Sequence, residues 1–284
     1  VTVTDLLESP VMRSAFPDLF PHIKLVSSTP IRNMATLAGN FVNASPIGDM
    51  TVWFLALDAE IILGSLAHSE ERKPKPAKWS DAVREIVSSI VSAEASGDRM
   101  LSLKDLYLGY KKLAKADDEI ITAIRFRKPS GDFRFNFEKV CKRTYLDIAT
   151  VNTAISLRCS GPMPGVGIMP DFLKNKLAQN YPPYTGREVA AFRERGGSPS
   201  DLVFRIEEVH VAAGGVAPIP LYLKQTSKFL TGREVNTETI AEANEIMQTE
   251  ISPISDVRGT EQYKRLLLRQ LFTAHFVEMF GVER

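Results

Sequence analysis

Apolar and polar positions follow a strand-then-helix pattern in the second half of the chain. Residues 119–127 alternate like a strand, residues 133–140 form another, and residues 147–157 are mostly apolar and rich in β-branched side chains. Strand character returns at residues 204–212. The last part is helical, because Ile240, Ala243 and Met247 share one helical face behind a possible cap at Asn236 or Thr237, and residues 260–280 keep a second apolar face.

The first half is less regular. Residues 1–25 have an apolar pattern broken by prolines, which indicates a helix and a loop. After them we expect a loop with short extended pieces at residues 27–49, a helix at 51–57 and a strand at 59–63. A solvated loop at residues 70–78 and a short helix at 103–112 follow. The pattern predicts a unit of mixed secondary structure.

Prolines and glycines interrupt the second half between residues 160 and 204, which predicts an inserted loop. Taken together, the elements predict an α+β protein. We expect a mixed first unit over residues 1–118 and a second unit, residues 119–284, of strands followed by a helical bundle.

Composition narrows the classes of protein. The 284 residues carry 35 basic and 34 acidic side chains, so the net charge of +1 gives no electrostatic reason to expect nucleic acid or an anionic membrane as a partner. Apolar runs such as residues 53–57 are too short to cross a bilayer. No signal peptide is recognisable at the start. We therefore expect a cytoplasmic protein.

Residues that could carry catalysis or bind metal are scarce. The chain has two cysteines, Cys141 and Cys159, which we interpret as reduced thiols; an iron–sulfur cluster would need about four. The four histidines share no metal-ligand spacing, and no nucleophile elbow or Walker loop is present. We therefore expect neither a catalytic residue nor a metal site in this chain.

Residues 36–49 have a composition suited to a phosphate-bearing cofactor. A hydroxyl, two small residues and an amide side chain lie between Thr36 and Asn40. A pyrophosphate needs close backbone approach, free amides and short donors, and Asp49 could accept hydrogen bonds from sugar or ribityl hydroxyls. The same residues also fit a polar turn followed by a helix, with Asp49 as cap. Composition alone favours the turn and cap.

The order of these residues adds a resemblance. The segments STPIRN, TLAGN and NASPIGD within residues 28–49 closely resemble the second FAD-binding segment of the molybdenum hydroxylases. That family includes the xanthine and carbon monoxide dehydrogenases and related aldehyde and aromatic hydroxylases. FEKV with Arg143 and DIA (137–149), AGGVAP (213–218), and ISDVRG with Tyr263 and Arg265 (254–265) resemble the family's later signatures. Several motifs in one order are more specific than any single motif.

The resemblance implies a set of cofactor-binding residues. Asp49 would bind cofactor hydroxyls, and Ile121 would pack on the flavin ring. Lys139 would lie near the polar edge of the flavin, where a cation stabilises the negative charge that develops on reduction. The residues alone leave two alternatives to these roles: Ile121 could be an ordinary core residue, and Lys139 an ordinary surface residue of a strand. The FAD pyrophosphate would lie against Thr36, Leu37, Ala38, Gly39 and Asn40, with Asn43 nearby.

The resemblance also implies a fold. It would be the second lobe of a vanillyl-alcohol-oxidase-like (PCMH-type) FAD-binding domain, followed by a domain with a three-stranded sheet and a helical bundle. Family members begin with a first glycine-rich FAD lobe, and nothing here matches it. They also usually have two adjacent glycines where Ala38 and Gly39 stand.

The implied function is electron transfer through FAD. A molybdopterin subunit would hydroxylate the substrate, 2Fe-2S centres on a partner chain would relay the electrons, and FAD would pass them to NAD or another acceptor. One alternative is a degenerate, FAD-free interaction subunit of the same complex, favoured by Ala38 and the missing first loop. A second is an unrelated nucleotide-binding α+β protein.

Overall fold

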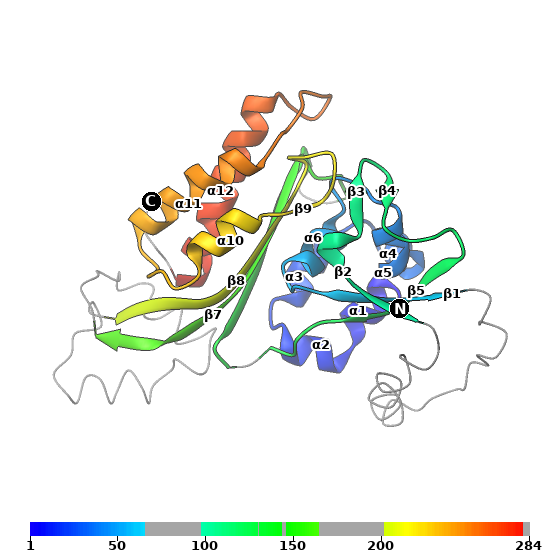
Figure 1. The fold of residues 1–284 in the computed structure, drawn as a ribbon, viewed down its shortest axis with the longest axis horizontal. Helices are drawn as coiled ribbons and strands as arrows, with labels where there is room; N and C mark the ends of the chain where they lie inside the picture. Colours follow the sequence, from blue (N-terminus) through cyan, green and yellow to red (C-terminus); the bar gives the residue numbers. More distant parts are fainter. Residues whose placement is uncertain (66–97, 130, 144–145, 165–201, 281–284) are drawn as a thin grey trace.

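A computed structural model describes residues 1–65, 98–129, 131–143, 146–164 and 202–280. These residues form a mixed helix-and-sheet fold in two units (Figure 1). The N-terminal unit combines short helices with a small sheet, and the C-terminal unit has a longer sheet backed by helices. In the described residues, no helix is both long and apolar enough to cross a membrane.

Short helices open the N-terminal unit: α1 (Val3–Glu8), α2 (Pro10–Ala15), α3 (Leu19–Lys24), α4 (Thr29–Met34), α5 (Leu37–Val42) and α6 (Asp49–Leu55). Helices this short are not stable alone and depend on burying one face. Trp53 of α6 lies in the centre of that core, where its ring contacts those of Phe16, Phe54 and Phe135. The expected loop with extended pieces at residues 27–49 is therefore wrong, because α4 and α5 occupy most of it.

The N-terminal sheet is antiparallel and has the order β2-β1-β5, formed by β1 (Glu60–Ser65), β2 (Arg99–Ser102) and β5 (Glu119–Arg125). Because β5 pairs with β1, the sheet of the N-terminal unit includes residues beyond residue 118, and the expected domain boundary at that residue stays a prediction. The helix expected at residues 103–112 is wrong. Only a short 3-10 turn, η3 (Leu103–Asp105), precedes a small hairpin of β3 (Tyr107–Gly109) and β4 (Lys112–Leu113). The solvated loop expected at residues 70–78 lies outside the described residues.

The C-terminal sheet has the antiparallel order β6-β7-β8-β9, from β6 (Phe133–Val140), β7 (Val151–Pro164), β8 (Leu202–Gly214) and β9 (Leu221–Tyr222). The first three are the strands expected from the sequence, and β9 adds a two-residue fourth. Both ends of the loop expected at residues 160–204 belong instead to β7 and β8, and residues 165–201 lie outside the described residues.

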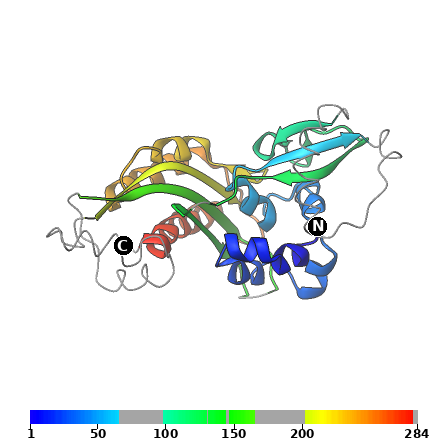
Figure 2. The same ribbon diagram turned by 90° about the horizontal axis from the view of Figure 1, so that it is seen from below.

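The C-terminal sheet lies between helices on its two faces. Helices α10 (Lys224–Leu230), α11 (Thr237–Glu250) and α12 (Glu261–Phe280) cover one face, and α6 contacts β7 and β8 from the other (Figures 1 and 2). Along β7, Val151, Ile155 and Leu157 pack in the core with α10–α12. Asn152 and Arg158 therefore point toward the N-terminal unit, because side chains alternate between the faces of a strand. This face of the sheet carries the polar groups discussed below.

A buried histidine gives the C-terminal unit an expected pH dependence. His275 of α12 is fully buried, and its Nδ1 lies 3.0 Å from the amide nitrogen of Asn136 on β6. Burial, with a smaller contribution from the nearby charge of His22, lowers the pKa of His275 to about 3. Its unfolded pKa is about 6.5. The unfolded state therefore binds this proton at a higher pH than the folded state does. The contribution of neutral His275 to the free energy of unfolding is complete above about pH 6.5 and is lost as the pH drops toward 3.

We expect the free energy of unfolding to fall by up to about 1.4 kcal/mol per pH unit below pH 6 because of this one proton. Urea titrations at pH 7 and pH 5 measure the effect. The substitution His275→Gln should make the pH dependence shallower than in the wild type. Equal pH dependence in His275→Gln and wild type would refute this account.

Candidate functional site

The start of α5 presents a polar face to solvent. Thr36 is its N-cap, and the hydroxyl of Thr36 accepts a hydrogen bond of 3.0 Å from the Gly39 amide. A Cβ at residue 39 would lie 2.8 Å from that hydroxyl, so glycine leaves room for the cap. Thr36, Gly39 and Asn43 are exposed, whereas Leu37 is buried in the core and Ala38 is half-buried. The exposed face offers small residues and short polar groups.

Side chains from outside α5 hold the loop that follows it. The Thr51 hydroxyl donates to Oδ1 of Asn40 at 3.1 Å. The Lys111 ammonium donates to the backbone oxygen of Asn43 and, at 3.3 Å, to its Oδ1. Lys111 was not predicted from the sequence, because the turn between β3 and β4 that places it was expected to be helix. These contacts fix the loop leading to Asp49.

Asp49 and Lys139 form a buried ion pair between the two units. Gly48, not Asp49, is the N-cap of α6, and the Asp49 carboxylate accepts a 2.7 Å hydrogen bond from Nζ of Lys139. The same ammonium donates to the backbone oxygen of Leu25 at 2.8 Å, and its side chain is only 1% exposed. Lys139 is therefore not the surface strand residue that the sequence left open. Burial raises the pKa of Asp49, and Lys139 and Asn152 oppose that effect.

Two further residues complete this contact, and neither was given a role from the sequence, although Gly214 lies within the AGGVAP motif. Nδ2 of Asn152, on β7, donates to Oδ1 of Asp49 at 2.6 Å. Gly214, on β8, lies against the Asn152 amide, and a Cβ at this position would come within 2.2 Å of Asn152 Oδ1. The signal in the sequence that could have pointed to Asn152 was an amide side chain within a mostly apolar expected strand.

Ile121 is not part of this group of residues. It lies on β5 opposite Leu63 and packs against the N-terminal core, half-buried. Among the described contacts, none joins it to Asp49 or Lys139. The structure thus brings Asp49 and Lys139 together, and α5 lies just before Asp49 in the chain. The role of Ile121 stays a prediction.

The cap at Thr36 can be tested by stability. Replacing Thr36 with valine removes the acceptor of the Gly39 amide, and we expect a loss of about 1 kcal/mol in the free energy of unfolding. Serine at the same position keeps a hydroxyl and should retain most of that stability. Chemical denaturation of the three proteins measures this, and equal stability of the valine and serine variants would contradict the assigned cap.

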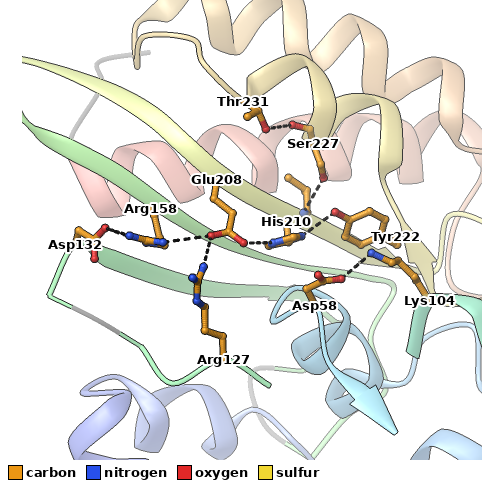
Figure 3. A network of polar contacts seen from close by, with 11 residues as sticks. Asp58, Lys104, Arg127, Asp132, Arg158, Glu208, His210, Tyr222, Ser227 and Thr231 are labelled. Atoms are coloured by element: carbon orange, nitrogen blue, oxygen red, sulfur yellow. Dashed lines mark hydrogen bonds and ion pairs between the residues drawn. The ribbon is translucent and has the colours of Figure 1, made fainter. Parts of the chain in front are cut away.

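A second polar feature lies farther along the same sheet face. A cleft of about 360 Å³ opens between the units, and Arg127, Arg158, Glu208 and His210 are among its lining residues. Glu208 is shared by Arg127 at 3.0 Å, Arg158 at 3.6 Å and His210 at 3.3 Å (Figure 3). Asp132 also binds Arg158, at 2.9 Å. The network ties the connector between the units to the sheet, and none of the cofactor residues expected from the sequence lines this cleft.

The fold is that of a two-domain flavoprotein subunit. Residues 1–85 match the family described as FAD binding domain in molybdopterin dehydrogenase, and residues 201–279 match the CO dehydrogenase flavoprotein C-terminal domain. The chain is a homologue of the FAD-binding subunits of the xanthine and carbon monoxide dehydrogenases, which are oxidoreductases.

Individual relatives are distant but cover nearly all of the chain. The glyceraldehyde dehydrogenase medium chain of Sulfolobus acidocaldarius is 22% identical over 97% of this chain and 72% of its own length. Xanthine dehydrogenase 1 of Arabidopsis thaliana is 23% identical over 93% of this chain, which spans only 15% of that much longer protein.

Solved structures show the same fold. Carbon monoxide dehydrogenase from Hydrogenophaga pseudoflava superposes with a TM-score of 0.67 at 19% identity, covering 96% of this chain and 70% of that one. Quinoline 2-oxidoreductase from Pseudomonas putida 86 gives a TM-score of 0.63 at 18% identity, covering 99% and 74%. The expected fold class is thereby confirmed.

Proposed function

We propose that this chain binds FAD and transfers electrons within a molybdenum hydroxylase. The observation that carries the proposal is the buried Lys139–Asp49 pair, which joins the end of the TLAGN…SPIGD segment to the C-terminal sheet. Two motifs separated by 90 residues meet at one point in the structure. Their meeting at the junction of two domains that match flavoprotein families supports a cofactor site there.

The residues present fit the cofactor. The exposed Thr36, Gly39 and Asn43 would receive the pyrophosphate, because small residues allow an anion close to the backbone. The carboxylate of Asp49 accepts one donor on each oxygen, which leaves lone pairs for cofactor hydroxyls. Toward the described part of the chain, Lys139 donates two of its three N–H groups, which leaves one for the cofactor.

Bound FAD would supply a carrier that accepts and releases electrons. The residues of this chain would position it and set its electrostatic surroundings. Lys139 supplies positive charge that favours the reduced, more negative form, and Asp49 offsets part of that charge at 2.7 Å. The buried pair also keeps water away from this edge, since the side chains are 1% and 13% exposed.

The proposal extends to the partners and the acceptor. Electrons would arrive from iron–sulfur centres and leave for NAD or another acceptor, with a molybdopterin subunit carrying the substrate chemistry. In the described residues, no three His, Cys, Asp or Glu side chains form a metal-binding cluster. A cytoplasmic location belongs to the same proposal, because Cys141 and Cys159 are both free thiols.

A visible absorption spectrum tests the proposal against the FAD-free alternative. The protein is purified with its native partners and then separated from loosely held small molecules by gel filtration. We expect a yellow protein whose flavin bands bleach on reduction. A colourless protein that takes up no added FAD would establish the interaction subunit instead.

A further inference from the structure

Asn152 occupies a position between the Asp49 loop and the C-terminal sheet. Its side chain is fully buried, and Nδ2 donates to Oδ1 of Asp49 at 2.6 Å and to the backbone oxygen of Ile47 at 3.4 Å. Both partners are acceptors, so the nitrogen of the amide must face them. The orientation of the Asn152 side chain is therefore fixed by its neighbours.

The two donors to the Asp49 carboxylate bind different oxygens. Oδ2 accepts from Lys139 and Oδ1 accepts from Asn152. A hydrogen bond to an ionised carboxylate is stronger than one between neutral groups and stabilises the charged form. Asn152 therefore favours the ionised form of the buried Asp49. Its hydrogen bond to Oδ1, together with that of Lys139 to Oδ2, fixes the orientation of the carboxylate.

The other end of the amide indicates that Asn152 is more than a packing residue. Among the described residues, Oδ1 of Asn152 has no hydrogen-bond partner, although it is buried. A buried acceptor without a partner is destabilising, so a leucine of similar size would serve packing alone better. Gly214 accommodates this oxygen, because a Cβ there would approach it to 2.2 Å. The fold therefore accepts the cost of the unpaired Oδ1 of Asn152 and keeps its Nδ2 as a donor to Asp49.

We propose that Asn152 is a positioning residue of the flavin site, which fixes the Asp49 carboxylate beside Lys139; this rests on the proposed function of the chain. Asn152 acts through Asp49. With Asn152 in place, Asp49 stays ionised and offsets the charge of Lys139. Without it, the carboxylate is less firmly held, and the positive charge of Lys139 is less completely offset.

The test compares Asn152→Leu with Asn152→Ala and with a matched control in the flavin-loaded complex. We expect Asn152→Leu to weaken FAD binding about tenfold, the loss of one charge-assisted hydrogen bond, as measured by flavin fluorescence titration. We also expect a more positive flavin midpoint potential in a redox titration, because less of the Lys139 charge is offset. Asn152→Ala adds no bulk beside Gly214 and should move both quantities in the same direction.

Asn244 of α11 provides the control. Its Nδ2 donates to Thr273 Oγ1 at 3.2 Å, and its Oδ1 is also buried without a partner in the described part of the chain. Asn244→Leu should leave affinity and potential at the wild-type values, whatever stability it loses. If wild type binds FAD and both Asn152 variants behave like it, or like Asn244→Leu, the role of Asn152 is refuted while the proposed function stands. If wild type binds no FAD, both are refuted.

Discussion

Replacing Gly215 with alanine is expected to destabilise the protein by roughly 3 kcal/mol or more, at the upper end for single substitutions. Gly215 has φ of +83°, where a side chain is disfavoured, and an added Cβ would lie 2.3 Å from the backbone oxygen of Thr150. Its amide also donates to the backbone oxygen of Pro46 at 2.9 Å. We therefore expect the substitution to displace the Asp49 loop and to weaken FAD binding together with stability.

Gly232 supplies the matched control. Its φ is +81°, nearly that of Gly215, but no heavy atom lies within 4 Å of the position of an added Cβ. Gly232→Ala should cost only about 1 kcal/mol, the conformational part of the effect. Urea unfolding of both variants separates the two contributions. Equal losses would mean that the close approach of Gly215 to Thr150 has no energetic consequence.

Replacing Lys139 with methionine is expected to cost about 3–5 kcal/mol, because it leaves Asp49 as a buried charge without its cation. The Lys139 side chain is 1% exposed and makes two hydrogen bonds, to Asp49 and to Leu25. The substitution should also shift the flavin midpoint potential to a more negative value, since a positive charge near the reduced flavin is lost. Denaturation and redox titration measure the two effects.

Lys264 of α12 is a close structural match that lies in a different part of the chain. Its side chain is 3% exposed, and its ammonium binds Asp256 and the backbone oxygen of Ile254, both at 2.8 Å. Lys264→Met should lose stability without changing the flavin potential. A change of potential in both variants would show that global destabilisation, and not the charge at Lys139, controls the flavin.

The strands and long helices of the C-terminal unit could be predicted from the sequence because each has a clear period. Residues 133–140 match β6, and of the two expected caps, Asn236 and Thr237, the structure shows Asn236, whose Oδ1 accepts a 2.8 Å hydrogen bond from the Thr239 amide. The cofactor roles that the resemblance implied for Asp49 and Lys139 stay predictions, although the two side chains form an ion pair. That pairing could not be obtained from periodicity, because it joins two units distant in the chain.

The errors in the N-terminal unit have a common cause. Helices α4 and α5 have six residues each, too few to show a period, and their small polar residues resemble those of a loop. The reversal between β3 and β4 depends on Lys111 at φ +57°, a conformation uncommon for a lysine. Asn152 and Gly214 were given no role because their importance depends on a contact between β7, β8 and the Asp49 loop.

The location of bound flavin is the most direct test of the account. An experimental structure of the FAD-loaded complex should place the pyrophosphate on the exposed face of Thr36 and Gly39, with cofactor hydroxyls at Asp49 and the flavin edge near Lys139. Density for the cofactor elsewhere, for example in the cleft lined by Arg127 and Arg158, would contradict it.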